Sequence, residues 1–336
     1  TGRNLFTTDG ALWNYAAGGL ARFDGREFFP LSTEQGMTAA PNSPLGACLE
    51  ANGMFWMGTS EGLWRYRPVG GAPPARFSPP GLPTDGILEM KTTSDGAIWW
   101  RTSGALVRYQ ADQGTVFTNL YSWRSNPDAT EYQVVFPYHL AASGNRLWVT
   151  GPGVGLVRFD GTNQLRWTRQ QGLPADDTGT VTTGPDGEVW LAVGAEGVVR
   201  FDGTNFSRLT QRDGLPPGRI TSISVMADRQ IWFGTADGTV ARFDGQSFTY
   251  FNTSSDLTSG QRGTANRECW DIQTGPDGAI WFGTSDRVWR FEEGTFRQYS
   301  AVDGMATERV SSLLATPEGA LVWLGRTNVL VTRDGQ

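Results

Sequence analysis

The sequence predicts an all-β fold built from repeats, and three observations support this prediction. Strand-like runs and Asp-Gly turns follow one another along the whole chain of 336 residues. A tryptophan also recurs at steps of 42, 43 or 49 residues, at Trp13, Trp56, Trp99, Trp148, Trp190, Trp232, Trp281 and Trp323. A period of this length, with four short antiparallel strands in each repeat, is typical of β-propeller blades.

The clearest repeat covers residues 219–250. Residues 220–225 space their apolar side chains as a strand does and are rich in β-branched residues, which predicts a first strand. Residues 230–235, 239–243 and 246–250 predict the second, third and fourth strands. No segment shows the sustained 3.6-residue apolar period of an amphipathic helix.

Asp-Gly pairs separate these strands, because glycine readily supplies the positive φ that tight turns require. Between the third and fourth strands they are Asp24-Gly25, Asp160-Gly161, Asp202-Gly203 and Asp244-Gly245. Between the first and second strands they are Asp9-Gly10, Asp95-Gly96, Asp186-Gly187 and Asp277-Gly278.

The repeats predict a single propeller domain over residues 1–336, with eight blades. The last repeat supplies three strands, at about residues 310–316, 321–325 and 329–332, so we expect the last blade to lack its outer strand within this chain. The alternative is a seven-bladed ring, which would leave one set of strands over.

The repeated tryptophans and arginines are interpreted as parts of the scaffold. A large flat indole fills the space between adjacent blades. One arginine per repeat is expected to pair with a turn carboxylate or to stack on a ring. These arginines are Arg22, Arg65, Arg108, Arg158, Arg200, Arg242 and Arg290.

Composition excludes several classes of protein. The net charge of −6 and the pI of about 5.0 argue against a nucleic-acid partner, which requires a basic face. No stretch approaches the roughly 20 apolar residues of a transmembrane helix, so we expect that this segment does not span a membrane. Cys48 and Cys269 occupy similar positions in two repeats and are expected to be buried free thiols.

The string Gly-Leu-Pro, a strand, Pro-Asp-Gly-x-Ile-Trp-Phe-Gly-Thr and then Gly-Val-x-Arg-Phe-Asp-Gly resembles the two-component regulator propeller repeat. The resemblance is strongest at residues 214–250 and 275–299 and clear at 53–66 and 172–206. That family forms the periplasmic sensor region of bacterial one-component and hybrid histidine-kinase receptors. The resemblance implies a non-catalytic, extracytoplasmic sensor of a small polar ligand or carbohydrate, with a signalling domain outside this chain.

Residues 275–282 are also similar to the repeat of virginiamycin B lyase, which implies a propeller enzyme that uses Mg²⁺ and a histidine general base. His139 is the only histidine of the chain and has no partner in a matching repeat, which argues against this enzyme. No zinc, phosphate-loop or nucleophile-elbow motif is found, so we expect no cofactor and no metal. A protein–protein interaction scaffold is the other open alternative.

Both 49-residue steps come from long links between repeats, which lack the Gly-Leu-Pro or Gly-Met of the other links. Loops held by a rigid scaffold commonly carry binding sites. The first long link, at about residues 118–138, and the residue after it give the candidates Trp123, Arg124, Tyr132, Tyr138 and His139. Aromatic rings with polar tips suit a sugar or a peptide, and Arg124 suits a carboxylate.

The second long link, at about residues 252–267, leads into Arg267, Glu268 and Trp270. Arg219 and Arg309 stand at the entrances of two further first strands. With other charges at such entrances they predict a mixed-charge rim, which comprises Asp85, Asp176, Asp177, Arg219, Arg267, Glu268, Glu308 and Arg309. A solvated rim that binds nothing is the plain alternative.

Overall fold

The computed structural model describes residues 3–6, 12–16, 19–23, 28–30, 46–49, 54–59, 62–66, 75–118, 139–226, 228–252, 269–274, 279–284, 288–292, 294–299, 312–315, 321–324 and 329–332. By its internal contacts the chain divides into two compact units, residues 5–181 and residues 182–336 together with residues 1–4. Within the described residues, three 3₁₀ turns of three residues each are the only helical segments, and the other elements are β-strands.

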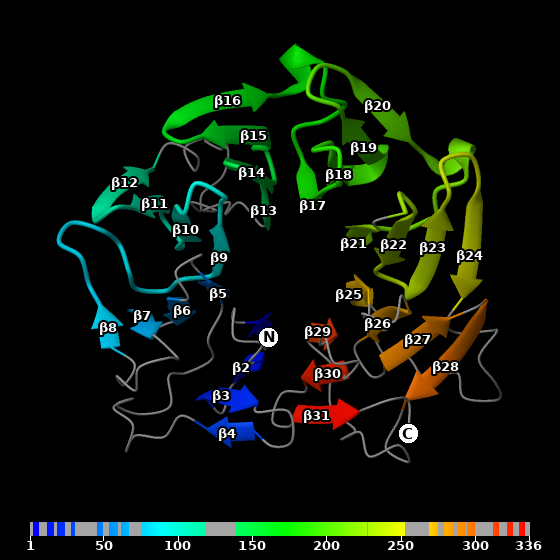
Figure 1. Cartoon of the computed structure of the whole chain (residues 1–336). Helices are drawn as coiled ribbons and strands as arrows, with labels where there is room; N and C mark the ends of the chain where they lie inside the picture. Colours follow the sequence, from blue (N-terminus) through cyan, green and yellow to red (C-terminus); the bar gives the residue numbers. More distant parts are fainter. Residues whose placement is uncertain are drawn as a thin grey trace, which may run out of the picture. The chain divides into compact units, whose positions relative to one another are not determined.

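Four antiparallel sheets come from the first half of the sequence, and in each the strands lie side by side in chain order (Figure 1). They are β1 (Arg3–Phe6), β2 (Leu12–Ala16), β3 (Gly19–Phe23) and β4 (Phe28–Pro30); β5 (Gly46–Leu49), β6 (Phe55–Thr59), β7 (Gly62–Tyr66) and β8 (Ala75–Phe77); β9 (Glu89–Thr92), β10 (Ile98–Arg101), β11 (Leu106–Gln110) and β12 (Gln113–Phe117); and β13 (His139–Ser143), β14 (Arg146–Gly151), β15 (Gly155–Asp160) and β16 (Asn163–Trp167).

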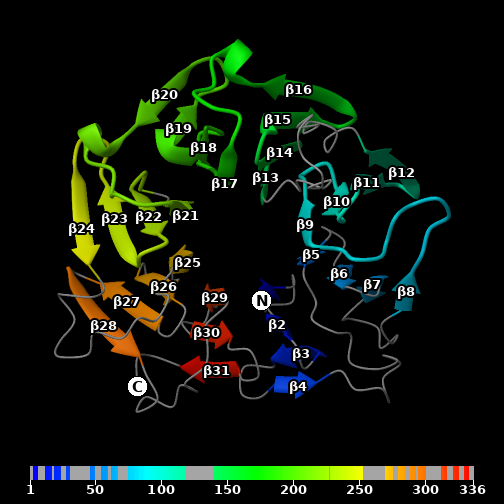
Figure 2. The ribbon, with the colours of Figure 1, turned by 180° about the vertical axis from the view of Figure 1, so that it is seen from behind.

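Four further sheets follow the same plan, which is also visible from behind (Figure 2). They are β17 (Thr178–Thr183), β18 (Val189–Val193), β19 (Gly197–Phe201) and β20 (Phe206–Leu209); β21 (Ile220–Val225), β22 (Ile231–Thr235), β23 (Thr239–Phe243) and β24 (Phe248–Asn252); β25 (Cys269–Thr274), β26 (Ile280–Thr284), β27 (Val288–Glu292) and β28 (Thr295–Tyr299); and β29 (Ser312–Ala315), β30 (Leu321–Leu324) and β31 (Val329–Thr332). The described residues thus form seven four-stranded sheets and a last sheet of three strands.

Within each unit, first strands of neighbouring sheets lie next to one another. In the unit of residues 5–181, β9 lies beside both β5 and β13, and in the other unit β25 lies beside both β21 and β29. Neighbouring first strands and four-stranded antiparallel sheets are consistent with the predicted β-propeller. The number of blades in a closed ring stays a prediction.

Seven of the eight repeated tryptophans on second strands stand directly opposite the repeated arginine on the third strand. The pairs are Trp13 and Arg22, Trp56 and Arg65, Trp99 and Arg108, Trp148 and Arg158, Trp190 and Arg200, Trp232 and Arg242, and Trp281 and Arg290. In the three-stranded sheet Leu330 takes the place of the arginine. This register explains the constant offset between the two residue types along the sequence.

In four sheets the guanidinium group stacks on the opposite indole, as predicted; the arginines are Arg108, Arg158, Arg242 and Arg290. The Cζ atom of Arg108 lies 5.8 Å from the ring centroid of Trp99, and that of Arg290 lies 5.5 Å from the ring of Trp281. Arg108 also pairs with a turn carboxylate, from Nη2 to Oδ2 of Asp95 at 2.7 Å. Both roles expected for the repeated arginine are therefore confirmed at Arg108.

Trp99 and Trp232 pack between neighbouring sheets, as predicted for the repeated tryptophans. Trp99 lies 5.9 Å from Phe117 on β12 and 5.3 Å from Phe159 on the next sheet, measured between ring centroids. The two phenylalanines are 4.8 Å apart, so the three rings form a closed triad. Trp232, Phe251 and Phe291 repeat this triad in the other unit. Each buried ring contributes at most about 4–6 kcal/mol of transfer free energy.

The Gly-Leu-Pro links owe their shape to a short capped turn. Thr210 caps the 3₁₀ turn η5 (Gln211–Asp213) in a capping box, and Gly214 ends it with a left-handed φ of 93°. Leu215 then enters the core, where it packs in the cluster around Trp190. The turn η3 (Arg169–Gln171) repeats this arrangement.

The Asp-Gly turns and the cysteines also behave as predicted. Asp244 caps its own turn by accepting hydrogen bonds at 2.8 Å from the backbone N–H groups of Gln246 and Ser247, while Gly245 takes a φ of 98°. The backbone N–H groups of Ser247 and Gln246 lower the pKa of the Asp244 carboxyl from its usual value. Cys48 and Cys269 are buried thiols that are not in a disulfide.

Candidate functional site

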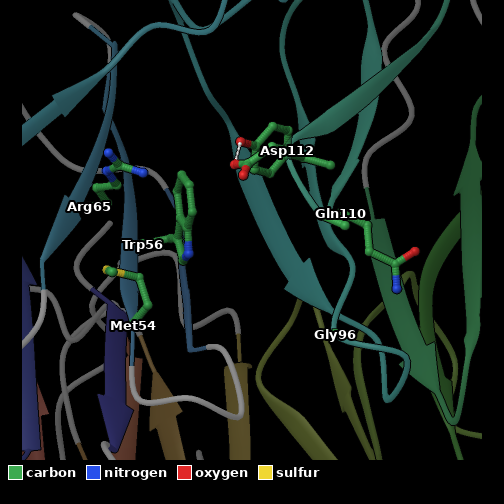
Figure 3. A pocket seen from close by; sticks show the side chains of 8 residues that line it. Met54, Trp56, Arg65, Gly96, Gln110 and Asp112 are labelled. Atoms are coloured by element: carbon green, nitrogen blue, oxygen red, sulfur yellow. Dashed lines mark hydrogen bonds between the residues drawn. The ribbon is translucent and has the colours of Figure 1, made fainter.

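A pocket of about 240 Å³ opens within the unit of residues 5–181, between the sheets β5–β8 and β9–β12 (Figure 3). Its lining residues are Met54, Trp56, Arg65, Gly96, Tyr109, Gln110, Ala111 and Asp112. All of them lie at the end of the sheets that carries the turns between first and second and between third and fourth strands. We call this the turn end, and the opposite end, where links join successive sheets, the link end.

Two of the lining residues, Trp56 and Tyr109, belong to an aromatic triad equivalent to the one around Trp99. Trp56 lies 4.9 Å from Phe77 and 5.9 Å from Tyr109, and Phe77 lies 5.3 Å from Tyr109. Tyr109 stands where the next sheet has Phe159. The triad at the pocket therefore carries a hydroxyl group that its counterpart lacks.

The β11–β12 turn supplies the wall above this hydroxyl. Tyr109 donates a hydrogen bond from Oη to Oδ1 of Asp112, over 2.7 Å (Figure 3). Ala111 and Asp112 both adopt left-handed backbone, with φ of 48° and 60°. Such conformations cost an L-residue with a Cβ roughly 1–2 kcal/mol each. The turn thus lacks the glycine of the repeat and holds a carboxylate over the pocket instead.

Arg65 lies on the opposite side of the pocket from Asp112 in Figure 3. Its Cζ atom lies 4.8 Å from the ring centroid of Phe77, so its guanidinium stacks on a different ring of the triad from that used by Arg108. Arg108, Arg158 and Arg290 each pair with a carboxylate, whereas Arg65 forms no ion pair among the described residues. Arg65 is also exposed to solvent.

A hydrogen-bond network on the far side of β11 supports the turn. Arg108 donates to Asp95 and to Oε1 of Gln110, and Gln110 donates to the carbonyl oxygen of Asp95. The Gln110 side chain accordingly points away from Trp56 (Figure 3). Burial alone would raise the pKa of the Asp95 carboxyl, but hydrogen bonds from Thr93, Arg108 and the backbone of Ala97 outweigh it and lower the pKa.

The link end of the same sheet carries a buried ion pair. Arg101 Nε lies 3.4 Å from Oε2 of Glu89, directly opposite it on β9, and both side chains are almost fully buried. Arg101 occupies the position two residues after the tryptophan, which is glycine at Gly58 and Gly234. A Cβ at Gly58 would lie only 2.2 Å from the Ile87 side chain. Sheet β9–β12 therefore departs from the repeat at both ends.

The structure describes two of the predicted site residues in full. His139 begins β13 opposite Thr150 and is partly buried. Arg219 is exposed before β21, and its carbonyl oxygen accepts a hydrogen bond from the N–H of Ala236. Trp270 lies in β25, but its side chain is outside the description. Trp123, Arg124, Tyr132, Tyr138, Arg267, Glu268 and Arg309 lie outside the described residues.

Three further charges of the predicted rim are described. Asp85 is exposed and lies 3.4 Å from Nη2 of Arg76. Asp176 accepts a hydrogen bond from the backbone N–H of Arg169, which ties it to the turn η3. Asp177 is exposed. The site predicted at the long links stays a prediction.

Reasoning from the sequence missed the pocket at the turn end, because its tryptophan and arginine belong to the repeat. One signal was present. The third repeat has Gln110-Ala111-Asp112 where the next three repeats have Asp-Gly, and it has Tyr109 where they have phenylalanine. Within the described residues, no group of three or more His, Cys, Asp or Glu side chains gathers as metal ligands would.

By sequence, the chain matches no protein-family profile and no curated protein. By structure, it is similar to the extracellular domain of a putative one-component system from B. thetaiotaomicron, with a TM-score of 0.64 and 14% identity over 99% of this chain and 52% of that one. A second such domain, from a putative hybrid two-component system of the same organism, has a TM-score of 0.61 and 13% identity over 99% and 56% of the two chains.

A catalytically inactive virginiamycin B lyase from Staphylococcus aureus, solved with quinupristin, has a TM-score of 0.60 and 13% identity over 98% of each chain. At such low identities these likenesses show the fold alone. What the proteins share is an all-β architecture. The chain spans about half of the length of the two extracellular domains.

No helix in the described part of the chain is long and apolar enough to cross a membrane.

Proposed function

We propose that this chain is a non-catalytic recognition propeller that binds a small polar ligand, as the extracytoplasmic part of a bacterial signalling receptor. The observation that carries the proposal is the pocket at the turn end of β5–β8 and β9–β12. There the third repeat has Ala111 in place of a turn glycine and Tyr109 in place of a core phenylalanine, and both residues line the pocket. Local strain that persists in a scaffold is often tied to function.

The similar structures support the signalling part of the proposal. Two of them are extracellular domains of putative one-component and hybrid two-component systems, and the likeness extends over nearly all of this chain. Because the chain spans only about half of those domains, the elements that report binding to the cell interior would lie elsewhere in such a receptor. The periplasm or the cell exterior is the matching location.

The dimensions of the pocket bear on the ligand. A volume of about 240 Å³ lies below the roughly 300–1,000 Å³ of sites for drug-sized molecules. The pocket therefore favours a single small polar molecule. Binding of an oligosaccharide would instead use the aromatic residues Trp123, Tyr132 and Tyr138 of the first long link.

Thermal-shift titration with two libraries tests the proposal, one of oligosaccharides and one of small polar metabolites. We expect a saturable rise in melting temperature with a member of one library. Loss of the shift in Arg65→Ala would place binding at the pocket, and loss in Trp123→Ala or Tyr132→Ala would place it at the long link. The absence of a shift with either library, together with a protein partner that stays bound in high salt, would favour an interaction scaffold.

A propeller lyase is the second candidate, because the lyase structure matches 98% of this chain and of its own length. Incubation with quinupristin and Mg²⁺, followed by liquid chromatography and mass spectrometry, tests it. We expect no turnover. Turnover that is lost in His139→Ala would contradict the non-catalytic assignment.

A further inference from the structure

The pocket has one charged side chain on each of its sides, and neither is neutralised by an ion pair with another described residue. The carboxylates of Asp202 and Asp244 accept hydrogen bonds from the backbone N–H groups of their own turns. Asp112 accepts only the Tyr109 hydroxyl among the described residues, so its second oxygen remains available. Arg65 likewise forms no ion pair among those residues and stacks on Phe77.

The aromatic residues of the pocket do not offer a stacking platform. Trp56 is only 2% exposed and Tyr109 is 8% exposed, because both are packed in the triad. Sugar rings are commonly held against an exposed aromatic face, which this pocket does not provide. The groups that a ligand meets are polar, and the two charged ones have opposite signs.

We infer that the pocket binds a small zwitterion, with a carboxylate on Arg65 and a primary ammonium on Asp112, as in a free α-amino acid. Arginine presents two parallel N–H donors that match a carboxylate. Asp112 is oriented by the Tyr109 hydroxyl, and the left-handed turn fixes it over the cavity. The inference rests on the proposed recognition function and names the ligand class for this pocket.

Isothermal titration with glycine, L-alanine, L-serine, L-glutamate and L-lysine tests the inference. We expect at least one of them to bind saturably. Its amide, which lacks the carboxylate, and its deaminated acid, which lacks the ammonium, should bind at least tenfold more weakly. Arg65→Gln should weaken binding of the amino acid at least tenfold and leave the affinity of the amide unchanged. Asp112→Asn should also weaken binding of the amino acid at least tenfold, and it should leave the affinity of the deaminated acid unchanged.

The matched control is Arg146→Gln on the next sheet, where an exposed arginine pairs with Asp160 at 3.0 Å. It should leave binding unchanged, and circular dichroism should show all three variants folded. Equal binding of the amino acid and its amide, or binding that survives both pocket variants, would overturn the inference. If only a neutral sugar binds, the proposed recognition function holds and the inference of a zwitterionic ligand is wrong. If no amino acid binds and no member of the two thermal-shift libraries binds, both proposals fail.

Discussion

Tyr109 and Asp112 are joined by a 2.7 Å hydrogen bond across a two-residue turn whose backbone is left-handed at both positions. The phenol thus links the buried aromatic triad to the exposed turn. No other described turn of the chain places two consecutive non-glycine residues at positive φ. The strained backbone of this turn positions the carboxylate of Asp112.

Tyr109→Phe restores the phenylalanine of the repeat and removes this hydrogen bond. We expect a loss of about 1 kcal/mol in the free energy of unfolding, since a hydrogen bond typically contributes about 0.5–1.5 kcal/mol. Ligand binding should weaken as well, because Asp112 loses its orienting partner. Urea unfolding and calorimetric titration measure the two effects. Tyr250→Phe, which removes the exposed hydroxyl bond to the Gly214 carbonyl, is the control and should leave binding intact.

Ala111→Gly should stabilise the protein by roughly 0.5–1 kcal/mol, because glycine adopts a φ of 48° without the cost that a Cβ imposes. The matched reverse change is Gly161→Ala in the β15–β16 turn. Gly161 has a φ of 60°, and a Cβ there would meet no atom within 4 Å, so only backbone strain is added. We expect a loss of about 1 kcal/mol in urea unfolding. A stabilised Gly161→Ala would show that strain does not govern these turns.

The Asp95–Arg108 pair predicts a pH dependence of stability. Because the folded pKa of Asp95 lies below its usual value of about 3.9, its contribution is complete above that value. The contribution is lost as the pH falls through the folded pKa. Asp95→Asn should therefore cost about 1–3 kcal/mol at pH 7 and flatten the loss of stability between roughly pH 5 and 2.

Urea midpoints at pH 7, 5, 4 and 3 measure this effect. Asp85→Asn is the control, since it removes only an exposed ion pair with Arg76 and should change the midpoint at pH 7 little. An unchanged pH profile in Asp95→Asn would show that this carboxylate does not stabilise the sheet.

Leu215 is expected to anchor its link to the core. It is 4% exposed, so Leu215→Ala should cost about 2–5 kcal/mol through lost burial and the cavity left behind. Leu165, which is 49% exposed on β16, is the control, and Leu165→Ala should change stability by no more than about 0.5 kcal/mol. Thermal unfolding compares the two variants. Equal effects would contradict the structural role of the Gly-Leu-Pro motif.

Much of the fold could be predicted because each repeat has the same spacing of strand, turn and core residues. The spacing of Trp232 and Arg242 follows from a fixed antiparallel register, and glycine at positive φ follows from turn chemistry. The burial of Cys48 and Cys269 could be inferred from their similar places in two repeats.

The pocket could not be predicted in the same way. Arg65 and Trp56 carry the signature of the scaffold, so their sequence context gives no sign that they border a cavity. The cavity depends on how the β11–β12 turn is placed against the neighbouring sheet, which is a matter of three-dimensional packing. Only the missing glycine next to Asp112, together with Tyr109 in place of phenylalanine, marked this turn as different.

The most direct test of the central claim is methyl NMR on protein labelled at the methionine methyl groups. Met54 lines the pocket, whereas Met226 packs in a core cluster of the other unit. On titration with the amino acid that binds, the account predicts a saturable shift of the Met54 resonance, no shift of Met226, and loss of the Met54 shift in Asp112→Asn. A Met54 resonance that stays in place while the ligand binds elsewhere would contradict it.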